Sequence, residues 1–249
     1  MAPRLNAFGQ PIGESMAAWQ PRARPARVVL EGRHCRLEPL DPARHGADLW
    51  HAHSQAMDAS GWTYLAVGPF DDAAAFAHYL AQAATSEDPL HYAVVDRYSG
   101  KALGTLSLMR IDPAHGVVEV GNVVFSPSLR RTPISTEAQY LLMAYVFDTL
   151  GYRRYEWKCD SLNGPSRDAA LRLGFQFEGV FRQAIVYKGR SRDTAWYSVI
   201  DGEWQAVRAG FVQWLSEDNF DASGAQRRPL ADIRKETSDM TGSATQASS

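Results

Sequence analysis

Two kinds of hydrophobic pattern follow one another along residues 117–151. Residues 117–125, VVEVGNVVF, form a nearly continuous β-branched apolar run, which is typical of a strand covered on both faces. A polar, basic loop comes next, and apolar residues then recur at helical spacing. Thr132 followed by Pro133 predicts the N-cap and first residue of that helix, and Gly151 predicts its end. We expect this strand–loop–helix unit to organise the fold.

The remaining pattern predicts further strands and helices around this unit. Three strands in succession before the central helix indicate an α+β fold rather than a regular βαβ array. Strands are expected within residues 28–40, as one bent strand or a pair, and at 91–95, 103–111, 155–159, 175–182 and 186–200. Helices are expected at 42–57, 71–83, 163–174 and 202–215.

Composition separates a central domain from two tails. Residues 1–26 are rich in Pro, Ala, Gly and Arg, and we interpret them as an extended arm pinned by isolated aromatic residues. Residues 27–216 carry the periodic patterns and form the predicted domain. Residues 217–249 are polar and rich in Ser and Thr, so this segment is predicted to be disordered.

Charge and cysteine content narrow the class of protein. The formal net charge of the 249 residues is −2, and no run of Lys and Arg exceeds a pair, which argues against nucleic acid as the main partner. No apolar segment approaches the roughly 20 residues needed to cross a bilayer, and no secretory signal is expected. Cys35 and Cys159 are far apart and in no paired motif. A reducing, cytoplasmic setting is therefore predicted.

The loop before the central helix has the features of an anion site. Free amide groups and the positive end of the helix dipole face such a loop, and Arg130 and Arg131 add two charges suited to phosphate oxygens. An ordinary βα unit with solvated arginines has the same pattern. Architecture alone leaves both interpretations open.

Several motifs, taken in order, resemble the GCN5-related N-acetyltransferase (GNAT) superfamily. They are TEA at residues 136–138, Asn163 with Ser166 three residues later, LGFQFEG at 173–179, and RD at 192–193. The order of elements over about residues 27–214 agrees with this family, and more narrowly with its ribosomal-protein N-terminal acetyltransferases. The resemblance implies a mixed, mostly antiparallel seven-stranded sheet flanked by helices.

The same resemblance implies that acetyl-CoA is bound at the central unit. In the family, two glycines in the loop let the backbone approach the pyrophosphate, but here Arg131 and Pro133 fill those positions. The two arginines either offset this change or leave binding weakened. The implied coenzyme-binding residues are Val123, Val124, Phe125, Arg130, Arg131, Thr132, Ile134, Ser135, Thr136, Asn163 and Arg167.

Two residues are candidates for the chemistry of acetyl transfer. The resemblance suggests Glu119 as the general base, and a carboxylate in an otherwise apolar strand is conspicuous. Its alternative role is a surface residue paired with an arginine. Many relatives protonate the thiolate with a tyrosine, whose place here holds Ala170, and Ser166 is the suggested substitute. Ser166 is equally interpreted as a first-turn helix residue bonded to the backbone.

The acceptor side is less defined by sequence. Trp62, Tyr64 and Asn122 are predicted to contact the amine, although the two aromatic residues have the alternative of being core. Cys159 is expected to be structural rather than acylated, and no metal site is predicted. These observations predict an acetyl-CoA-dependent N-acetyltransferase that acts on a protein N-terminus or a small-molecule amine in a ternary complex, as a monomer or homodimer. The alternative is a weakly active or inactive acyl-CoA-binding regulatory domain.

Overall fold

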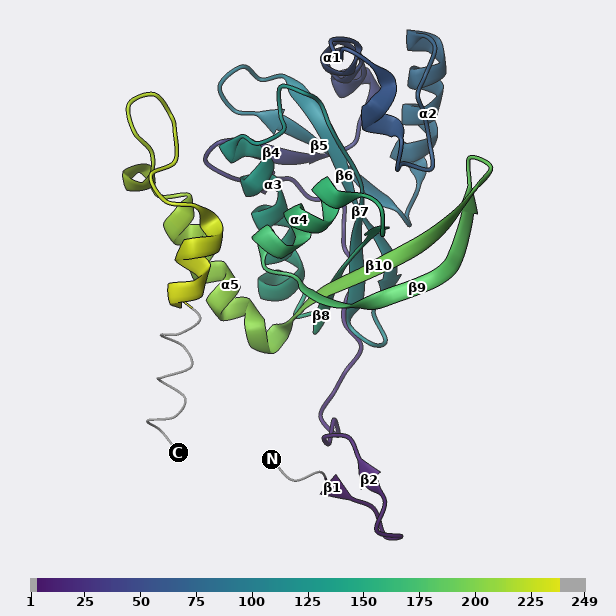
Figure 1. The fold of residues 1–249 in the computed structure, drawn as a ribbon, viewed down its shortest axis with the longest axis vertical. Coiled ribbons are helices and arrows are strands. Elements are labelled where there is room, and N and C mark those ends of the chain that lie inside the picture. The colour runs from purple at the N-terminus through teal and green to yellow at the C-terminus, as the bar shows by residue number, and fades with distance from the viewer. Residues whose placement is uncertain (1–3, 238–249) are drawn as a thin grey trace.

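The computed structural model describes residues 4–237 and has the predicted α+β organisation (Figure 1). The main sheet has eight strands in the order β3-β4-β5-β6-β7-β8-β10-β9. Neighbouring strands are antiparallel except β7 and β8, which run parallel. The strands are β3 (Leu30–Glu31), β4 (Cys35–Pro39), β5 (Leu90–Asp96), β6 (Ala102–Asp112), β7 (Val117–Phe125), β8 (Arg154–Asp160), β9 (Gln176–Tyr187) and β10 (Arg190–Ile200).

The eighth strand, beyond the seven predicted, is β3 at one edge of the sheet. Strands β3 and β4 form a short antiparallel pair in which Leu30 lies opposite Leu37. The turn between them contains Gly32, where a Cβ atom would lie 2.6 Å from the Glu137 carboxylate. The close approach of helix α3 therefore breaks the segment into a strand pair instead of one bent strand.

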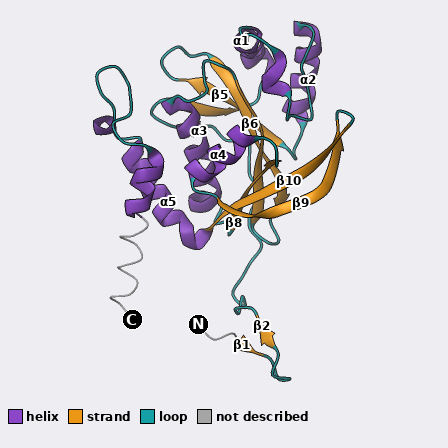
Figure 2. Cartoon of the chain, viewed as in Figure 1, coloured by secondary structure: helices purple, strands orange, loops and turns teal. Residues whose placement is uncertain are grey.

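Helices cover both faces of the sheet (Figure 2). Strand β5 shows the division, because Tyr92 and Val94 join a large core with α3, α4 and α5, whereas Ala93 and Val95 join a smaller core with α1 and α2. Among residues 4–237, no helix has the length and apolar character needed to cross a bilayer. The helical elements are α1 (Pro42–Ser54), η1 (Ala59–Trp62), α2 (Ala73–Thr85), α3 (Pro133–Ala144), the π-helical η2 (Tyr145–Thr149), α4 (Gly164–Leu173), α5 (Asp201–Trp214) and η3 (Glu217–Asn219).

The central strand–loop–helix unit is confirmed. Strand β7 ends at Phe125, and α3 begins at Pro133 after Thr132, whose hydroxyl accepts the amide of Ser135 at 3.3 Å. The helix continues through the π-helical η2, and Gly151 follows with a φ of 65°. That left-handed conformation is the one in which glycine carries no steric penalty.

The N-terminal segment is held to the domain by Trp19. Its indole Nε1 donates to the carbonyl of Ala114 at 2.8 Å, and the Arg22 guanidinium lies over its ring at 4.5 Å. Strands β1 (Arg4–Leu5) and β2 (Pro11–Ile12) form a small hairpin that stands away from the domain in Figure 1. Phe8 at its turn is exposed, so one of the isolated aromatic residues docks and another does not.

The segment after α5 differs from the prediction. Disorder was expected from residue 217, but the chain packs back on the domain as far as residue 237, and residues 230–237 are helical. Leu230 and Ile233, three apart on that helix, are each 1% exposed within the large core. Hydrogen bonds from the Asn219 side chain to the Trp214 and Arg228 carbonyls also hold this otherwise polar segment. The rest of the predicted tail lies outside the described residues.

Candidate active site

Strands β7 and β8 separate part-way along their length. Their parallel pairing ends where Val120 lies opposite Trp157, although both strands continue beyond that point. On the other side of β7 the register with β6 shifts between Thr105 and Ser107, and Asn122 adopts a φ of 48°. A bulge of this kind bends a strand and increases its twist. The two strands therefore separate near residues 121–122, which leaves part of β7 unpaired on its β8 side.

The loop at the end of β7 offers amide groups at the N-terminus of α3. In the hydrogen-bond network of residues 4–237, the amides of Arg131, Thr132 and Ile134 donate to no protein group. Unused amides at a helix N-terminus suit an anion because they combine hydrogen bonding with the helix dipole. Pro133 occupies the first helical position and contributes no N–H. This loop is a candidate anion-binding site, with one backbone amide fewer than it would have if a glycine stood at position 133.

Arg131 takes the backbone conformation that a glycine would take. Its φ is 61°, in the left-handed region that a non-glycine residue adopts at a cost of roughly 1–2 kcal/mol. Its exposed side chain makes no hydrogen bond or ion pair within residues 4–237. The replacement of the family glycine thus preserves the loop path and adds an uncommitted positive charge.

Arg130 is already engaged on the opposite side of the loop. Its Nε donates to the Phe125 carbonyl at 3.0 Å, and its guanidinium lies against Gly61, where an added Cβ would come within 2.6 Å. Burial, reinforced by this guanidinium, lowers the pKa of His53 to about 4. Arg130 therefore joins the anion loop to the segment after α1, so Arg131 is the freer of the two expected phosphate ligands.

The hydroxyls of the first turn of α3 are used inside the protein. The Ser135 hydroxyl donates to the Thr132 carbonyl at 2.7 Å, and the Thr136 hydroxyl accepts from the Arg172 guanidinium at 2.7 Å. Thr136 is 1% exposed. These side chains stabilise the helix start and its contact with α4, which leaves the backbone and Arg131 as the groups that face outward.

Glu137, the carboxylate of the TEA motif, has a structural environment. It accepts hydrogen bonds from the successive amides of Arg33, His34 and Cys35 at 2.8, 2.6 and 2.7 Å. The side chain is buried, with the residue 4% exposed. It satisfies the turn between β3 and β4, and thereby ties that edge of the sheet to α3.

Glu119 lies on the face of the sheet opposite α3 and α4, because its neighbours Val118 and Val120 point into the large core. The residue is 5% exposed, and its Oε2 lies 3.0 Å from Lys158 Nζ and 3.1 Å from Arg110 Nε. Burial raises the pKa of the Glu119 carboxyl, and the two cations oppose that rise. The expected carboxylate is therefore buried and paired, with a pKa moved toward neutrality.

Sequence reasoning did not find Lys158. Its strand alternates charged and apolar residues, a pattern that indicates one solvated face. In the structure that face is covered, and the Lys158 side chain is only 5% exposed. Lys158 contacts both Glu119 and Glu156. Its contact with Glu119 depends on the register of β7 with β8, which the sequence pattern does not give.

Asn163 and Ser166 lie at the start of α4, on the face of the sheet that α3, α4 and α5 cover. The Asn163 side chain accepts the Ser166 amide at 3.2 Å and caps the helix. The Ser166 Oγ accepts from the Trp157 indole at 3.0 Å. Burial raises the pKa of the Cys159 thiol, which a hydrogen bond from Ser166 partly opposes. Ser166 is thus placed beside the unpaired part of β8, whereas Glu119 lies on the other face.

Arg167 and the acceptor candidates are held by local contacts. Arg167 Nε donates to the Tyr197 hydroxyl at 3.2 Å. Tyr64 reaches across to α4, its hydroxyl donating to the Leu162 carbonyl at 3.2 Å. Trp62 packs on Phe70, with ring centroids 5.3 Å apart. Trp62 thus belongs partly to the smaller core, while Tyr64 bridges two segments that border the separation of β7 and β8.

Asn122 and the β9–β10 turn complete this border. Asn122 Nδ2 donates to the Ser107 hydroxyl at 3.1 Å, beside the bulge. The turn approaches the loop after η1 (Figure 1), where Lys188 Nζ donates to the Trp62 carbonyl at 2.8 Å and Arg190 donates to the Thr63 carbonyl at 2.7 Å. The loop that carries the two aromatic residues is therefore fixed from the far edge of the sheet.

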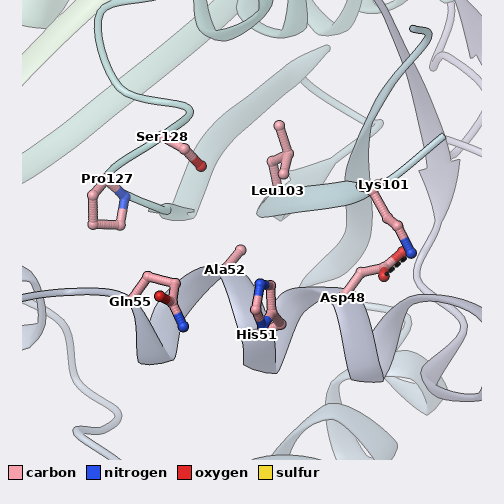
Figure 3. A pocket seen from close by; sticks show the side chains of 8 residues that line it. All are labelled: Asp48, His51, Ala52, Gln55, Lys101, Leu103, Pro127 and Ser128. Atoms are coloured by element: carbon pink, nitrogen blue, oxygen red, sulfur yellow. Dashed lines mark hydrogen bonds and ion pairs between the residues drawn. The ribbon is translucent and has the colours of Figure 1, made fainter. Parts of the chain in front are cut away.

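A cavity of about 590 Å³ lies between α1 and the loop that follows β7 (Figure 3). Lys101 Nζ and Asp48 form an ion pair at 2.9 Å at one end of it. None of the candidate catalytic residues lines this cavity, and it borders the anion loop only through Pro127 and Ser128. Its full lining is Asp48, His51, Ala52, Gln55, Lys101, Leu103, Pro127 and Ser128.

Comparison with known proteins identifies the family to which this geometry belongs. The model of the acetyltransferase (GNAT) domain matches residues 34–176, more than half of the chain. A solved GCN5-related N-acetyltransferase from Brucella melitensis is 50% identical, has a TM-score of 0.85, and aligns over 87% of this chain and 98% of its own. The chain belongs to the GNAT family. The predicted family and fold are confirmed.

Two further GNAT relatives extend the comparison. A crystal structure of a probable acetyltransferase (GNAT family) from Chromobacterium violaceum is 44% identical, has a TM-score of 0.73, and aligns over 79% of this chain and 98% of its own. "Putative ribosomal N-acetyltransferase YdaF" of Bacillus subtilis is 29% identical over 111 residues, which are 45% of this chain and 60% of that protein. The chain spans less than two thirds of the curated relatives that it matches. The name of this relative agrees with the predicted resemblance to ribosomal acetyltransferases.

No group of three or more His, Cys, Asp or Glu side chains within residues 4–237 is arranged to hold a metal ion. Both cysteines are free and buried. The chemical groups gathered around the separation of β7 and β8 are therefore a buried carboxylate with two cations, a serine, and the amides of the anion loop.

Proposed function

We propose that this GNAT chain transfers an acetyl group from acetyl-CoA to a primary amine, by direct attack in a ternary complex. The acceptor class is a protein N-terminus or a small-molecule amine. The observation that carries the proposal is the separation of β7 from β8, with unused amides at one end and Glu119 beside it. This arrangement supports a substrate that enters between the strands and meets an amine from the opposite face.

The anion loop fits the pyrophosphate of coenzyme A. The amides of Arg131, Thr132 and Ile134 are free to donate, the first turn of α3, which includes Ser135, supplies the positive end of a helix dipole, and the Arg131 charge is uncommitted. On its β8 side, β7 is unpaired at Val123, Val124 and Phe125, where it would bond to the pantetheine arm in the manner of an added strand, although the Phe125 carbonyl already accepts from Arg130. Asn163 and Arg167, at the start of α4, border the same space.

Glu119 is proposed as the base that removes a proton from the amine. A lysine-like amine has a pKa near 10.4 and an α-amine one near 8, so most acceptor molecules are protonated at neutral pH. Burial raises the pKa of the Glu119 carboxyl, which makes it a stronger acceptor for that proton than an exposed glutamate. The carboxylate contacts Arg110 and Lys158, so the proton passes from the amine to a carboxylate within a charged cluster rather than to an isolated group.

Ser166 is proposed to donate a proton to the departing thiolate. Its Oγ accepts the Trp157 indole N–H, and its hydroxyl hydrogen would turn from the Cys159 sulfur to the departing thiolate. Ser166 and Glu119 lie on opposite faces of the sheet, and proton removal and proton donation are thereby separated in space. The absence of a tyrosine on α4, where Ala170 is fully buried, makes this hydroxyl the nearest substitute on that helix.

The regulatory alternative rested on the lost glycines and on the missing tyrosine of α4, and the left-handed conformation of Arg131 weakens the first of these arguments. The two free, buried cysteines support the cytoplasmic location that we propose with this function.

Titration calorimetry with acetyl-CoA, followed by thiol release with a panel of amines, tests the proposal. The panel consists of short peptides with free N-termini, polyamines and amino-acid derivatives. We expect micromolar or tighter binding and turnover on at least one amine. Binding without turnover on any member would favour the regulatory domain, and absence of binding would contradict both.

A further inference from the structure

We propose that Lys158 is a positioning residue for acid–base chemistry, which holds the Glu119 carboxylate ionised and aimed toward the amine. The inference rests on the proposed role of Glu119 as base. It adds to that role a second residue, on another strand, that decides the pH range in which the base works.

The geometry around Lys158 leaves its ammonium group little freedom. Its Nζ lies 3.0 Å from Glu119 Oε2 and 2.6 Å from Glu156 Oε2, and 3.8 Å from the centroid of the Trp196 ring. Two carboxylates and an aromatic face thus surround a cation whose side chain is 5% exposed. An ammonium group so enclosed is held in one place.

Lys158 also occupies a special place along β8. The last paired residue of β8 is Trp157, opposite Val120, and Lys158 is the next residue along the chain. It therefore spans from β8 to β7 at the point where their backbone hydrogen bonds stop. The Lys158–Glu119 ion pair replaces the missing backbone link at the edge of the proposed reaction site.

The charges that face Glu119 come from two strands, β6 and β8. Arg110 on β6 and Lys158 on β8 contact its Oε2, while Glu156 on β8 repels it and contacts Lys158. Arg154 contacts Glu156, and Lys158 is in turn near Glu178 on β9. Cations and carboxylates alternate along this row. Removing Lys158 leaves Glu119 and Glu156 on adjacent strands with no cation between them.

Arg110 is a natural comparison because it lies as close to Glu119 as Lys158 does. The distances are 3.1 and 3.0 Å, but the Arg110 side chain is 55% exposed and that of Lys158 only 5%. Water and salt screen an exposed charge far more than a buried one. Lys158 should therefore control the protonation of Glu119, and Arg110 should modify it only slightly.

The experiment measures the Glu119 pKa directly, by the pH titration of ¹³C-labelled glutamate carboxyl groups, with Glu119→Gln to assign the resonance. In Lys158→Met, burial and Glu156 act without the main opposing charge, so the pKa rises by about one to three units. The acid limb of the kcat/KM profile should move to higher pH by the same amount. At a pH below this limb, kcat/KM of the variant should be about tenfold or more lower than that of the parent. In Arg110→Met both shifts should stay within about half a unit.

Lys158→Arg is the conservative variant, and it should restore the parent titration midpoint because it returns a positive charge to the same place. Melting temperature and acetyl-CoA affinity report whether each variant is folded. If Lys158→Met does not fold, Glu156→Gln gives a test of opposite sign. It removes the competing carboxylate, so the Glu119 pKa should fall, and a rise or no change would overturn the inference.

The readouts separate this inference from the proposed function. A Glu119 midpoint that is the same in Lys158→Met and the parent overturns the role of Lys158, whatever the activity. If that midpoint shifts while Glu119→Gln retains parent turnover, Lys158 controls the carboxylate as inferred but Glu119 is not the base, and the positioning role in catalysis is overturned with it. A shift in both the midpoint and the acid limb supports the inference.

Discussion

Two buried glutamates of the central unit, one on its strand and one on its helix, have different kinds of partner. Glu137 on α3 accepts three backbone amides from one turn, whereas Glu119 on β7 meets two side-chain cations from two other strands. They are 4% and 5% exposed. Burial alone therefore does not distinguish Glu137 from Glu119, the proposed base, whereas their partners do.

The partners differ in what they allow. Three backbone amides in fixed positions occupy both oxygens of Glu137, so this buried carboxylate is committed to the turn between β3 and β4. The cations around Glu119 both contact Oε2. Side-chain cations influence the protonation of this carboxyl without filling its hydrogen-bond capacity with fixed backbone donors, which is compatible with the proposed role as base.

The largest expected effect is on turnover. Glu119→Gln keeps the shape of the side chain but removes the base, so kcat should fall by about 10²–10⁴-fold while the fold and acetyl-CoA affinity persist. The loss should shrink as pH rises toward the pKa of the acceptor, where free amine becomes plentiful. Steady-state thiol release across pH measures this. Near-parent turnover at neutral pH would mean that Glu119 resembles Glu137 in being structural.

The matching change on α3 should act on stability instead. Glu137→Ala leaves the amides of Arg33, His34 and Cys35 without their acceptor, and each buried unsatisfied group costs about 1–3 kcal/mol. We expect the free energy of unfolding in urea to fall by at least about 3 kcal/mol. Turnover per folded molecule should persist.

A control for that prediction lies on the same turn. Glu31 is exposed and forms a surface ion pair with Arg97. Glu31→Ala should cost less than about 1 kcal/mol. Equal losses for Glu31→Ala and Glu137→Ala would show that the three amide hydrogen bonds are not what stabilises this edge of the sheet.

A pH effect on folding sets the range in which Glu119 is best studied. Burial lowers the pKa values of His53 and His91 to about 4, with Arg130 and Arg27 contributing respectively. Between about pH 6.5 and 4 the unfolded chain binds protons that the folded chain does not, so stability is full above that window and falls as pH decreases. At pH 5 the loss is about 2 kcal/mol for each histidine.

Urea unfolding at several pH values measures this loss, and His53→Gln should reduce the slope. A stability that stays flat from pH 7 to pH 5 would show that the buried histidines do not resist protonation. Because turnover and folding would both decline at acid pH, the acid limb assigned to Glu119 should be recorded together with the melting temperature.

Much of the fold followed from the sequence because it depends on local periodicity. The β-branched run of β7 and the Thr132–Pro133 start of α3 are short-range signals, and the structure agrees with them. Glu119 was identifiable for the same reason, as a carboxylate within an apolar strand. The C-terminal segment was missed because Leu230 and Ile233 stand alone in a polar context and their value depends on a distant core.

The side chains that contact the candidate site residues depend on the pairing of distant strands, so local periodicity did not predict them. Lys158 lies beside Glu119 only because β7 pairs with β8 in one particular alignment. The function of Glu137 likewise depends on a turn about 100 residues earlier in the chain. A family motif marked Glu137 as notable, but only the contacts separate its role from that of Glu119.

The smallest expected effect concerns Arg131, in the loop between the two glutamates. Arg131→Ala removes the charge and keeps the strained left-handed backbone, whereas Arg131→Gly removes the charge and relieves the strain. If the side chain contacts phosphate, both variants should weaken acetyl-CoA by about tenfold, consistent with the loss of one partly exposed charge-assisted contact. A phosphate-free pantetheine thioester should bind all three proteins alike. If Arg131→Gly binds acetyl-CoA as tightly as the parent, the loop recognises phosphate through its amides alone, and the Arg131 side chain does not contribute to coenzyme binding.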